Sequence, residues 1–382
     1  MLKESVSKNK LFLLLIFLMA GWFFYHWYFD KSHPIAGMGW CDQTIYFKVA
    51  QKLAKKESIP ANIFSYQIGY PLLGALFYFL FPQNPFMPVS LLLLLASLAF
   101  LYFGAKSAFS SPIFIILFLF LLFWGDGAAR TLNYPIEIFA VSWNNQVLFF
   151  CFSFFFWLFW SRKKINLKLL FLTGLITGLT ISSREESVLF ILPLLAIASK
   201  QYRIKGKNLL FLILISLLFY LPQPIMKTKI AGSIFSTGRL SDQNISYIRK
   251  LLTYTNKERL ANNLIDVVYN SSARNLDFGK IGVKAILQTN PWLWLSLPGL
   301  ALFFFKNKKS TIAKKFFILS SFFLLYFYLA GENMNIYKLK YCCIRYITPA
   351  FISLNFGVVF LISNICCCID LKLKKWQKNK NF

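Results

Sequence analysis

The sequence predicts an all-α polytopic membrane protein. Of its 382 residues, 57% are hydrophobic and 19% are aromatic, and 44 are phenylalanine. Apolar runs of about 15 to 20 residues recur along almost the whole chain, as in proteins whose helices cross a bilayer. The short segments between these runs are rich in lysine and arginine, which is typical of cytoplasmic loops. We therefore expect a single integral-membrane domain over residues 1–382, embedded in a lipid bilayer.

The charge of the chain is strongly positive. Lysine and arginine number 42 against 14 aspartate and glutamate residues, which gives a formal net charge of +28. In a soluble protein this excess would indicate nucleic acid as a partner. Here the basic residues lie mostly between apolar runs, so we expect no nucleic-acid binding. The seven cysteines show no spacing typical of a metal site.

Eleven apolar segments follow one another along the chain. They cover residues 11–29, 69–81, 88–104, 112–124, 147–160, 169–182, 188–199, 209–221, 292–305, 316–330 and 347–365. The first segment follows Lys3, Lys8 and Lys10, and no convincing cleavage site comes after it. We therefore expect a retained signal-anchor helix with its N-terminus in the cytoplasm.

Basic clusters set the expected orientation of the chain. The clusters at 162–168, 200–207 and 306–315 and both termini are placed on the cytoplasmic side. The expected outer loops are then about 30–68, 222–290 and 331–345. Two termini on one side require an even number of crossings, so one segment between residues 69 and 124 crosses only partly. Pro112–Trp124 or its neighbour is our choice, which leaves about ten transmembrane helices and one partial helix.

The first outer loop contains a segment with helical periodicity, from Asp42 to Lys56. Ile45, Val49 and Leu53 repeat every fourth residue, and the lysines fall largely elsewhere around the turn. This pattern predicts an amphipathic helix along the membrane surface, because it carries too many charges to cross a bilayer. Asp42 stands at the start of the helix, where aspartate is a good cap, so capping is the simplest interpretation of that residue alone.

Ionisable residues beside apolar segments on the expected outer side are few. The acids are Asp42, Glu137, Glu185, Glu186 and Glu332, and the cations at helix ends are Arg184 and Arg345. Such groups are costly near hydrocarbon and tend to be paired or functional. Arg184 with its two following glutamates also fits a structural ion-pair turn, and Arg345 also fits an interfacial anchor. Tyr70-Pro71 also fits the ordinary first turn of a helix.

Taken in order, these motifs resemble the GT-C type integral-membrane glycosyltransferases. The first likeness is a first helix followed by the outer Asp42, an interfacial helix, and Tyr70-Pro71 opening the second helix. The second is a helix with Gly174 and Gly178 that runs through Leu-Thr-Ile-Ser-Ser to Arg184, similar to their glycine-containing helix that ends in an arginine. The third is Arg345-Tyr-Ile-Thr-Pro349, which is similar to the Arg-Tyr-x-x-Pro motif before a late helix.

The resemblance implies transfer of a hexosyl or pentosyl group from a polyprenyl-phosphate-linked donor to a lipid or glycan acceptor on the non-cytoplasmic side. Such a transfer needs a carboxylate to deprotonate the acceptor hydroxyl. Asp42 is the expected general base, and Glu137 is a second carboxylate that orients the acceptor. The leaving lipid phosphate needs cations. The residues expected to bind substrate are Arg184, Glu185, Arg345, Tyr70 and Lys48. No cofactor is implied. The resemblance leaves dependence on a divalent metal open, and nothing in the residues indicates one.

Two other classes of membrane protein fit parts of the pattern. A polymerase or ligase of lipid-linked polysaccharide would also carry many helices, outer arginines and a large outer loop. A transporter or flippase would be expected to show acids or broken helices near the middle of the membrane. In this sequence the ionisable residues cluster at the ends of apolar segments, which favours the transferase.

Overall fold

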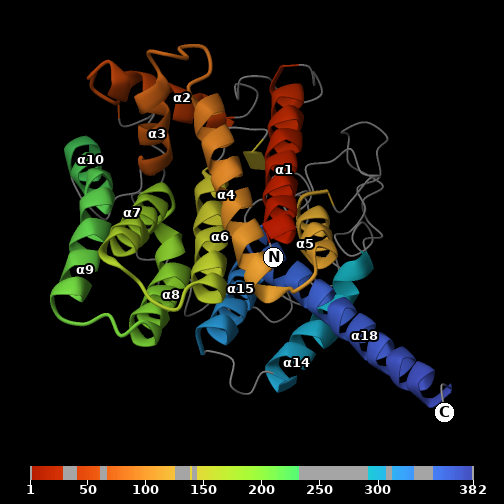
Figure 1. Cartoon of the computed structure of the whole chain (residues 1–382). Coiled ribbons are helices and arrows are strands. Elements are labelled where there is room, and N and C mark those ends of the chain that lie inside the picture. Colours follow the sequence, from red (N-terminus) through yellow and green to blue (C-terminus); the bar gives the residue numbers. More distant parts are fainter. Residues whose placement is uncertain are drawn as a thin grey trace.

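The computed structural model of the chain describes residues 2–28, 41–60, 67–124, 138–139, 144–231, 291–306, 312–330 and 347–380. Within these ranges the regular structure is helical and there is no β-strand, which confirms the predicted all-α class (Figure 1). The helices are α1 (Leu2–Tyr28), α2 (Cys41–Ala54), α3 (Gly69–Phe77), α4 (Phe86–Ala108), α5 (Pro112–Trp124), α6 (Asn145–Ser161), α7 (Leu167–Ser183), η3 (Glu185–Ser187), α8 (Val188–Gln201), α9 (Lys207–Tyr220), α10 (Pro222–Ala231), η5 (Pro291–Leu295), α14 (Ser296–Lys306), α15 (Ile312–Ala330) and α18 (Ala350–Lys380).

Three helices among the described residues are long and apolar enough to cross a membrane. They are Phe86–Ala108, Lys207–Ile230 (which joins α9 and α10) and Ala350–Leu373. At 1.5 Å per residue each reaches about 35 Å, more than the roughly 30 Å hydrocarbon core of a bilayer. Shorter apolar helices lie beside them, among them Asn145–Ser161 and Leu167–Ser183. These helices are typical of a membrane protein, and the number of about ten crossings stays a prediction.

Helix α6 lies at the centre of the bundle. Almost all of its residues are buried, as expected for a helix that is apolar all round. Phe156 is in ring contact with Phe317 of α15 and with Phe356 of α18, with ring centroids 6.0 Å apart in both pairs. On the peripheral helices, by contrast, many large apolar side chains are exposed, for example Phe17 and Leu218. Exposed apolar side chains on peripheral helices are what contact with lipid tails requires.

The basic segments that follow α6 and α8 and precede α15 lie at one end of the bundle. The Tyr202 hydroxyl, just after α8, donates a hydrogen bond of 2.6 Å to the Leu158 carbonyl near the end of α6. The Lys314 ammonium at the start of α15 lies 5.6 Å from the centre of the Trp160 ring, also near the end of α6. The segments that the sequence groups on one side of the membrane are therefore neighbours in space.

Helix α2 lies across the opposite end of the bundle, near α3 and α10 (Figure 1). The predicted surface segment is helical, and its apolar residues are divided between two contacts. Val49 belongs to a small cluster with Ile68, against which Met226 of α10 packs. Tyr46 contacts Tyr70 of α3 edge-on, with 5.4 Å between ring centroids. Helix α2 is therefore fixed to both α3 and α10.

Helix α3 is shorter than the apolar segment 69–81 that contains it. It has 9 residues, so it is about 14 Å long and too short to cross a hydrocarbon core. The chain turns after Phe77, and Pro82 and Pro85 lie between α3 and α4. Helix α5 has 13 residues and is about 20 Å long. Both α3 and α5 are therefore candidates for the partial helix expected between residues 69 and 124.

The expected outer loop 222–290 begins with a helix. The sequence predicts a loop from Pro222, whereas α10 continues α9 for 10 further residues. Pro222 is the first residue of α10, and its missing N–H marks the boundary between α9 and α10. The side chain of Gln223 accepts a hydrogen bond of 2.6 Å from the Ile68 backbone N–H, which fixes α10 to the segment before α3. The rest of 222–290 and the expected loop 331–345 lie outside the described residues.

Labelling of single cysteines tests this two-ended arrangement. In a background without the seven native cysteines, we expect Lys163→Cys and Lys229→Cys to react with a membrane-impermeant maleimide from opposite sides. Both positions are exposed. Residue 163 follows α6 and residue 229 lies in α10, and the end of α6 and α10 lie at opposite ends of the bundle (Figure 1). The positive-inside rule places residue 163 in the cytoplasm. Labelling of both positions from the same side of intact cells would contradict the arrangement.

Candidate functional site

The candidate site is built where α7 ends. Helix α7 packs closely against α9, because a Cβ at Gly178 would overlap the Ser216 carbonyl and lie 2.9 Å from the Phe219 Cβ. The helix stops at Ser183, and Arg184 takes an extended conformation with φ −153° and ψ 99°. This change of direction turns the Arg184 side chain away from the line of α7 and toward α15. A glycine-containing helix that ends in an arginine, as predicted, is therefore present.

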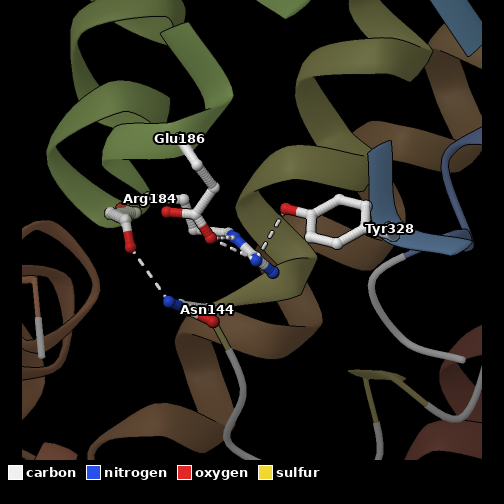
Figure 2. Close-up of polar contacts among 5 residues, drawn as sticks. Asn144, Arg184, Glu186 and Tyr328 are labelled. Atoms are coloured by element: carbon white, nitrogen blue, oxygen red, sulfur yellow. Dashed lines mark hydrogen bonds and ion pairs between the residues drawn. The ribbon is translucent and has the colours of Figure 1, made fainter. Parts of the chain in front are cut away.

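Arg184 is buried among polar partners. Its side chain makes an ion pair with Glu186, in which Nε donates a hydrogen bond of 3.0 Å to Oε1 and Nη2 donates a second bond to the same oxygen. Nη2 also donates to the Tyr328 hydroxyl at 2.8 Å, and the guanidinium carbon lies 5.4 Å from the centre of the Tyr328 ring. Figure 2 shows these three side chains converging from α7, η3 and α15. Arg184 is 3% exposed.

The end of α7 is also bonded to the start of α6. The Asn144 side chain donates a hydrogen bond of 2.9 Å from Nδ2 to the Ser183 carbonyl (Figure 2). Carbonyls in the last turn of a helix have no partner within the helix, so this bond satisfies one of them. Asn144 is buried, which makes the bond valuable, because a buried carbonyl without a partner is costly. The chain at Arg184 is thus fixed both by the bond from Asn144 to the Ser183 carbonyl and by the bonds of the Arg184 side chain.

A second ion pair lies beside the first. The Lys227 ammonium of α10 is 2.5 Å from Glu185 Oε2, and Lys227 is 5% exposed. We call Arg184, Glu185, Glu186 and Lys227 the charged junction. It contains two cations and two carboxylates, so its formal charges balance at neutral pH. Such a set is stable in a buried place only while each charge keeps its partner.

The environment of Glu186 favours its ionised form, which preserves the charge balance of the junction. Burial raises the pKa of a carboxyl group, but the charge of Arg184 and its hydrogen bonds outweigh burial here, and the pKa of Glu186 is lowered below its ordinary value. Glu186 is therefore ionised at neutral pH and compensates the arginine. The Tyr328 hydroxyl contributes in the same direction.

The structure brings Tyr70 close to the junction. Tyr70 is buried and stacks on Phe86, with 4.8 Å between ring centroids. The preceding residue, Gly69, touches the end of α7, because a Cβ there would overlap the Ser182 side chain and lie 2.6 Å from the Ser183 nitrogen. The start of α3 therefore lies directly against the residues before Arg184, and only glycine allows this approach.

The other predicted site residues are placed less completely. Asp42 lies in the first turn of α2, and its side chain is outside the described part of the structure. Glu137 and Arg345 also lie outside the described residues. Lys48 is exposed on α2 and is not part of the charged junction. Tyr70, Arg184 and Glu185 are the predicted residues that the described chain brings together.

Several residues of the site are not predicted from the sequence. Lys227 and Gln223 fall in a segment read as a loop, although their spacing of four residues would place them on one face of a helix. Tyr328 is one of many aromatic residues in its segment, so no sequence pattern distinguishes it as a site residue. Asn144 begins a polar triplet at the start of the aromatic helix α6, and that position is the available signal.

The fold and the junction together define a class: an apolar helical bundle with a buried, charge-balanced polar cluster near one end. Comparison with known proteins adds nothing to this description. No protein-family model, no curated protein and no solved structure matches the chain.

Removal of one charge tests whether the junction is a buried ion-pair set. We expect Glu186→Gln to lower the stability of the folded protein by about 3 kcal/mol, because it leaves the buried Arg184 without its carboxylate. The matched control is Glu57→Gln, which breaks the exposed pair with Lys52 at 3.3 Å and should cost less than about 1 kcal/mol. Thermal unfolding of the purified protein in detergent measures both. Equal effects of the two substitutions would refute the buried pairing.

The pH dependence of stability gives a second test. Since the pKa of Glu186 is lower in the folded state, its stabilising contribution is present above the ordinary glutamate pKa and is lost as pH falls through the folded value. As pH falls below the ordinary glutamate pKa, the wild-type melting temperature should therefore fall more steeply than that of Glu186→Gln, which has no carboxyl at this position to protonate. Parallel curves for the two proteins would mean that Glu186 has no lowered pKa.

Proposed function

We propose that the protein is a membrane glycosyltransferase that moves a sugar from a polyprenyl-phosphate-linked donor to a lipid or glycan acceptor. The observation that carries the proposal is the contact of α2, α3 and α7 at one end of the bundle. Tyr46 of α2 contacts Tyr70 of α3, and Gly69 lies against Ser183, next to Arg184. Three segments that carry the family resemblance, far apart in sequence, thus meet in one region.

The chemistry assigned to this region is an inverting transfer. The Asp42 carboxylate takes the proton of the acceptor hydroxyl, and the acceptor oxygen forms a bond to the anomeric carbon while the bond from that carbon to the phosphate oxygen breaks. The electron pair of the broken bond leaves with the lipid phosphate. Glu137 orients the acceptor, and Arg345 is a further cation for the phosphate.

The charged junction supplies the cations for the leaving phosphate. A planar guanidinium binds a phosphate or a carboxylate with the same two-pronged geometry. An incoming lipid phosphate therefore competes with Glu186 for Arg184 and with Glu185 for Lys227. In the absence of substrate the two glutamates keep the cations neutralised, which lowers the cost of burying them. Burial then strengthens the attraction to a bound phosphate.

The proposal includes an orientation in the membrane. The charged junction and α2 lie on the non-cytoplasmic side, with α2 in the interface, and the basic clusters and both termini lie in the cytoplasm. About ten helices cross, with α3 or α5 as the partial one. Exposed apolar side chains of α9, such as Leu214 and Leu218, suit contact with a polyprenyl tail.

The charges of the described helices favour a transferase over a transporter. Arg184 and Glu186 follow the end of a helix, Lys106 and Lys306 lie in last turns, and Lys227 is near the end of the joined helix α9–α10. Transporters typically place such groups at interruptions near the middle of the membrane. This distribution supports a site at the surface of the membrane.

The proposed roles predict the effects of two substitutions. Asp42→Asn should leave α2 formed, because it removes one charge from the first turn of the helix, which costs at most about 1 kcal/mol, while transfer falls by about 10² to 10⁴-fold with the loss of the base. Arg184→Lys keeps the charge but loses the planar fork, so it should weaken binding of the lipid phosphate. Mass analysis of membrane glycolipids and surface glycans, in cells that lack the native protein and express each variant, measures transfer.

The control for Asp42→Asn is Glu57→Gln, a change of carboxylate to amide just beyond the other end of α2, at an exposed residue. It should leave the glycan pattern unchanged. Membrane insertion is checked for every variant by its amount in the membrane fraction. Full glycan synthesis by a normally inserted Asp42→Asn protein would mean that Asp42 has no catalytic role and only stabilises the first turn of α2.

A further inference from the structure

The side-chain amide of Gln43, on α2, is buried without a hydrogen bond to the described part of the protein. Gln43 is 1% exposed, and among the described residues neither its Nε2 nor its Oε1 has a hydrogen-bond partner. A primary amide in such a position loses its bonds to water and gains none from the protein. Buried polar groups without partners are uncommon in folded proteins, and a bound ligand is one way to satisfy them.

The position of Gln43 relates it to the site. Gln43, Tyr46 and Ala50 are spaced by three and four residues, so they share one face of α2. That face is turned toward the bundle, because Tyr46 and Ala50 belong to the large core cluster that also contains Tyr70. Gln43 is therefore the polar end of an otherwise apolar row, and it follows Asp42 directly in the sequence.

A second unpartnered group lies at the end of α7. Ser183 is fully buried, and its Oγ has no hydrogen-bond partner among the described residues, although its carbonyl is bonded to Asn144. Ser183 stands next to Arg184 and packs against Gly69, the neighbour of Tyr70. Gln43 and Ser183 thus approach the Tyr70 region from α2 and from α7.

Both unpartnered groups are neutral, and both can donate as well as accept a hydrogen bond. An amide side chain offers two N–H donors and a carbonyl acceptor, and a serine hydroxyl offers one donor and two lone pairs. Hydroxyl groups of a sugar need this mixture. An ionised phosphate only accepts, so it would leave the Gln43 carbonyl oxygen unsatisfied.

We propose that Gln43 and Ser183 bind hydroxyl groups of the sugar carried by the lipid donor. The inference rests on the proposed function and deepens it, since it assigns recognition of the neutral sugar to this pair and recognition of the phosphate to the charged junction. Binding of the glycosylated lipid should then be tighter than binding of the bare lipid phosphate. The difference should depend on the two neutral side chains.

The test is lipid binding by the full-length protein in nanodiscs. The probes are radiolabelled polyprenyl phosphate, polyprenyl-phosphate glucose and polyprenyl-phosphate mannose. We expect wild type to prefer at least one glycosylated lipid over the bare one, and Gln43→Leu or Ser183→Ala to weaken binding of that lipid about tenfold, the usual effect of losing a hydrogen bond in a site. Binding of the bare lipid phosphate should not change.

Stability in the absence of lipid supplies a readout that does not depend on the proposed function. Gln43→Leu should leave the melting temperature unchanged or raise it, because it removes a buried amide without partners. The matched control is Gln51→Leu on the same helix, which loses a hydrogen bond of 2.9 Å from Nε2 to the Tyr78 hydroxyl. That control should lower the melting temperature and keep the preference for the glycosylated lipid.

The possible failures are distinguishable. If wild type binds a glycosylated lipid preferentially and both variants keep that preference, the assignment of Gln43 and Ser183 is wrong while the proposed function stands. A marked loss of stability in Gln43→Leu without lipid would also overturn the assignment, because it would show a structural partner for the amide. If wild type binds none of the three lipids, the proposed function fails, and this inference fails with it.

Discussion

Burial of the Arg184 guanidinium is the constraint on which the polar end of the bundle depends. A guanidinium cannot lose its charge at any ordinary pH, so each N–H must find an acceptor and the charge must find a carboxylate. Glu186 and Tyr328 accept the hydrogen bonds of Nε and Nη2 from η3 and α15, and Glu186 supplies the carboxylate. The neighbouring pair of Glu185 and Lys227 adds α10 to the same arrangement. The relative positions of four elements therefore follow from satisfying two buried cations.

Much of the fold could be predicted from apolar length alone. The segments 88–104, 147–160 and 169–182 lie within α4, α6 and α7, because a long apolar run has few alternatives to a helix. The ends of α3 and α9 could not be predicted in this way. Apolar residues continue past Phe77 into an exposed turn, and α10 is polar and owes its helical form partly to contacts with Ile68 and Glu185 from distant parts of the chain.

The site was predictable to a smaller degree. Arg184 and Glu185 were predicted as site residues because they lie at the end of an apolar segment. The ion-pair turn considered for them is present in part, since Arg184 pairs with Glu186. The partner of Glu185 is Lys227, 42 residues away, and no local pattern contains that pairing. Gln43 looks like part of a polar surface in the sequence, because helical periodicity marks the apolar face of α2 but does not show that a second face is buried.

Photo-crosslinking tests most directly whether the charged junction receives a lipid phosphate. The probe is a polyprenyl-phosphate sugar with a diazirine on its first isoprene unit, added to membranes that contain the full-length protein. We predict labelling of peptides from residues 182–187 and 223–231, which unlabelled polyprenyl phosphate displaces and which Arg184→Ala loses. Labelling confined to the opposite end, such as residues 162–168 or 306–315, would contradict a lipid-phosphate site at the charged junction.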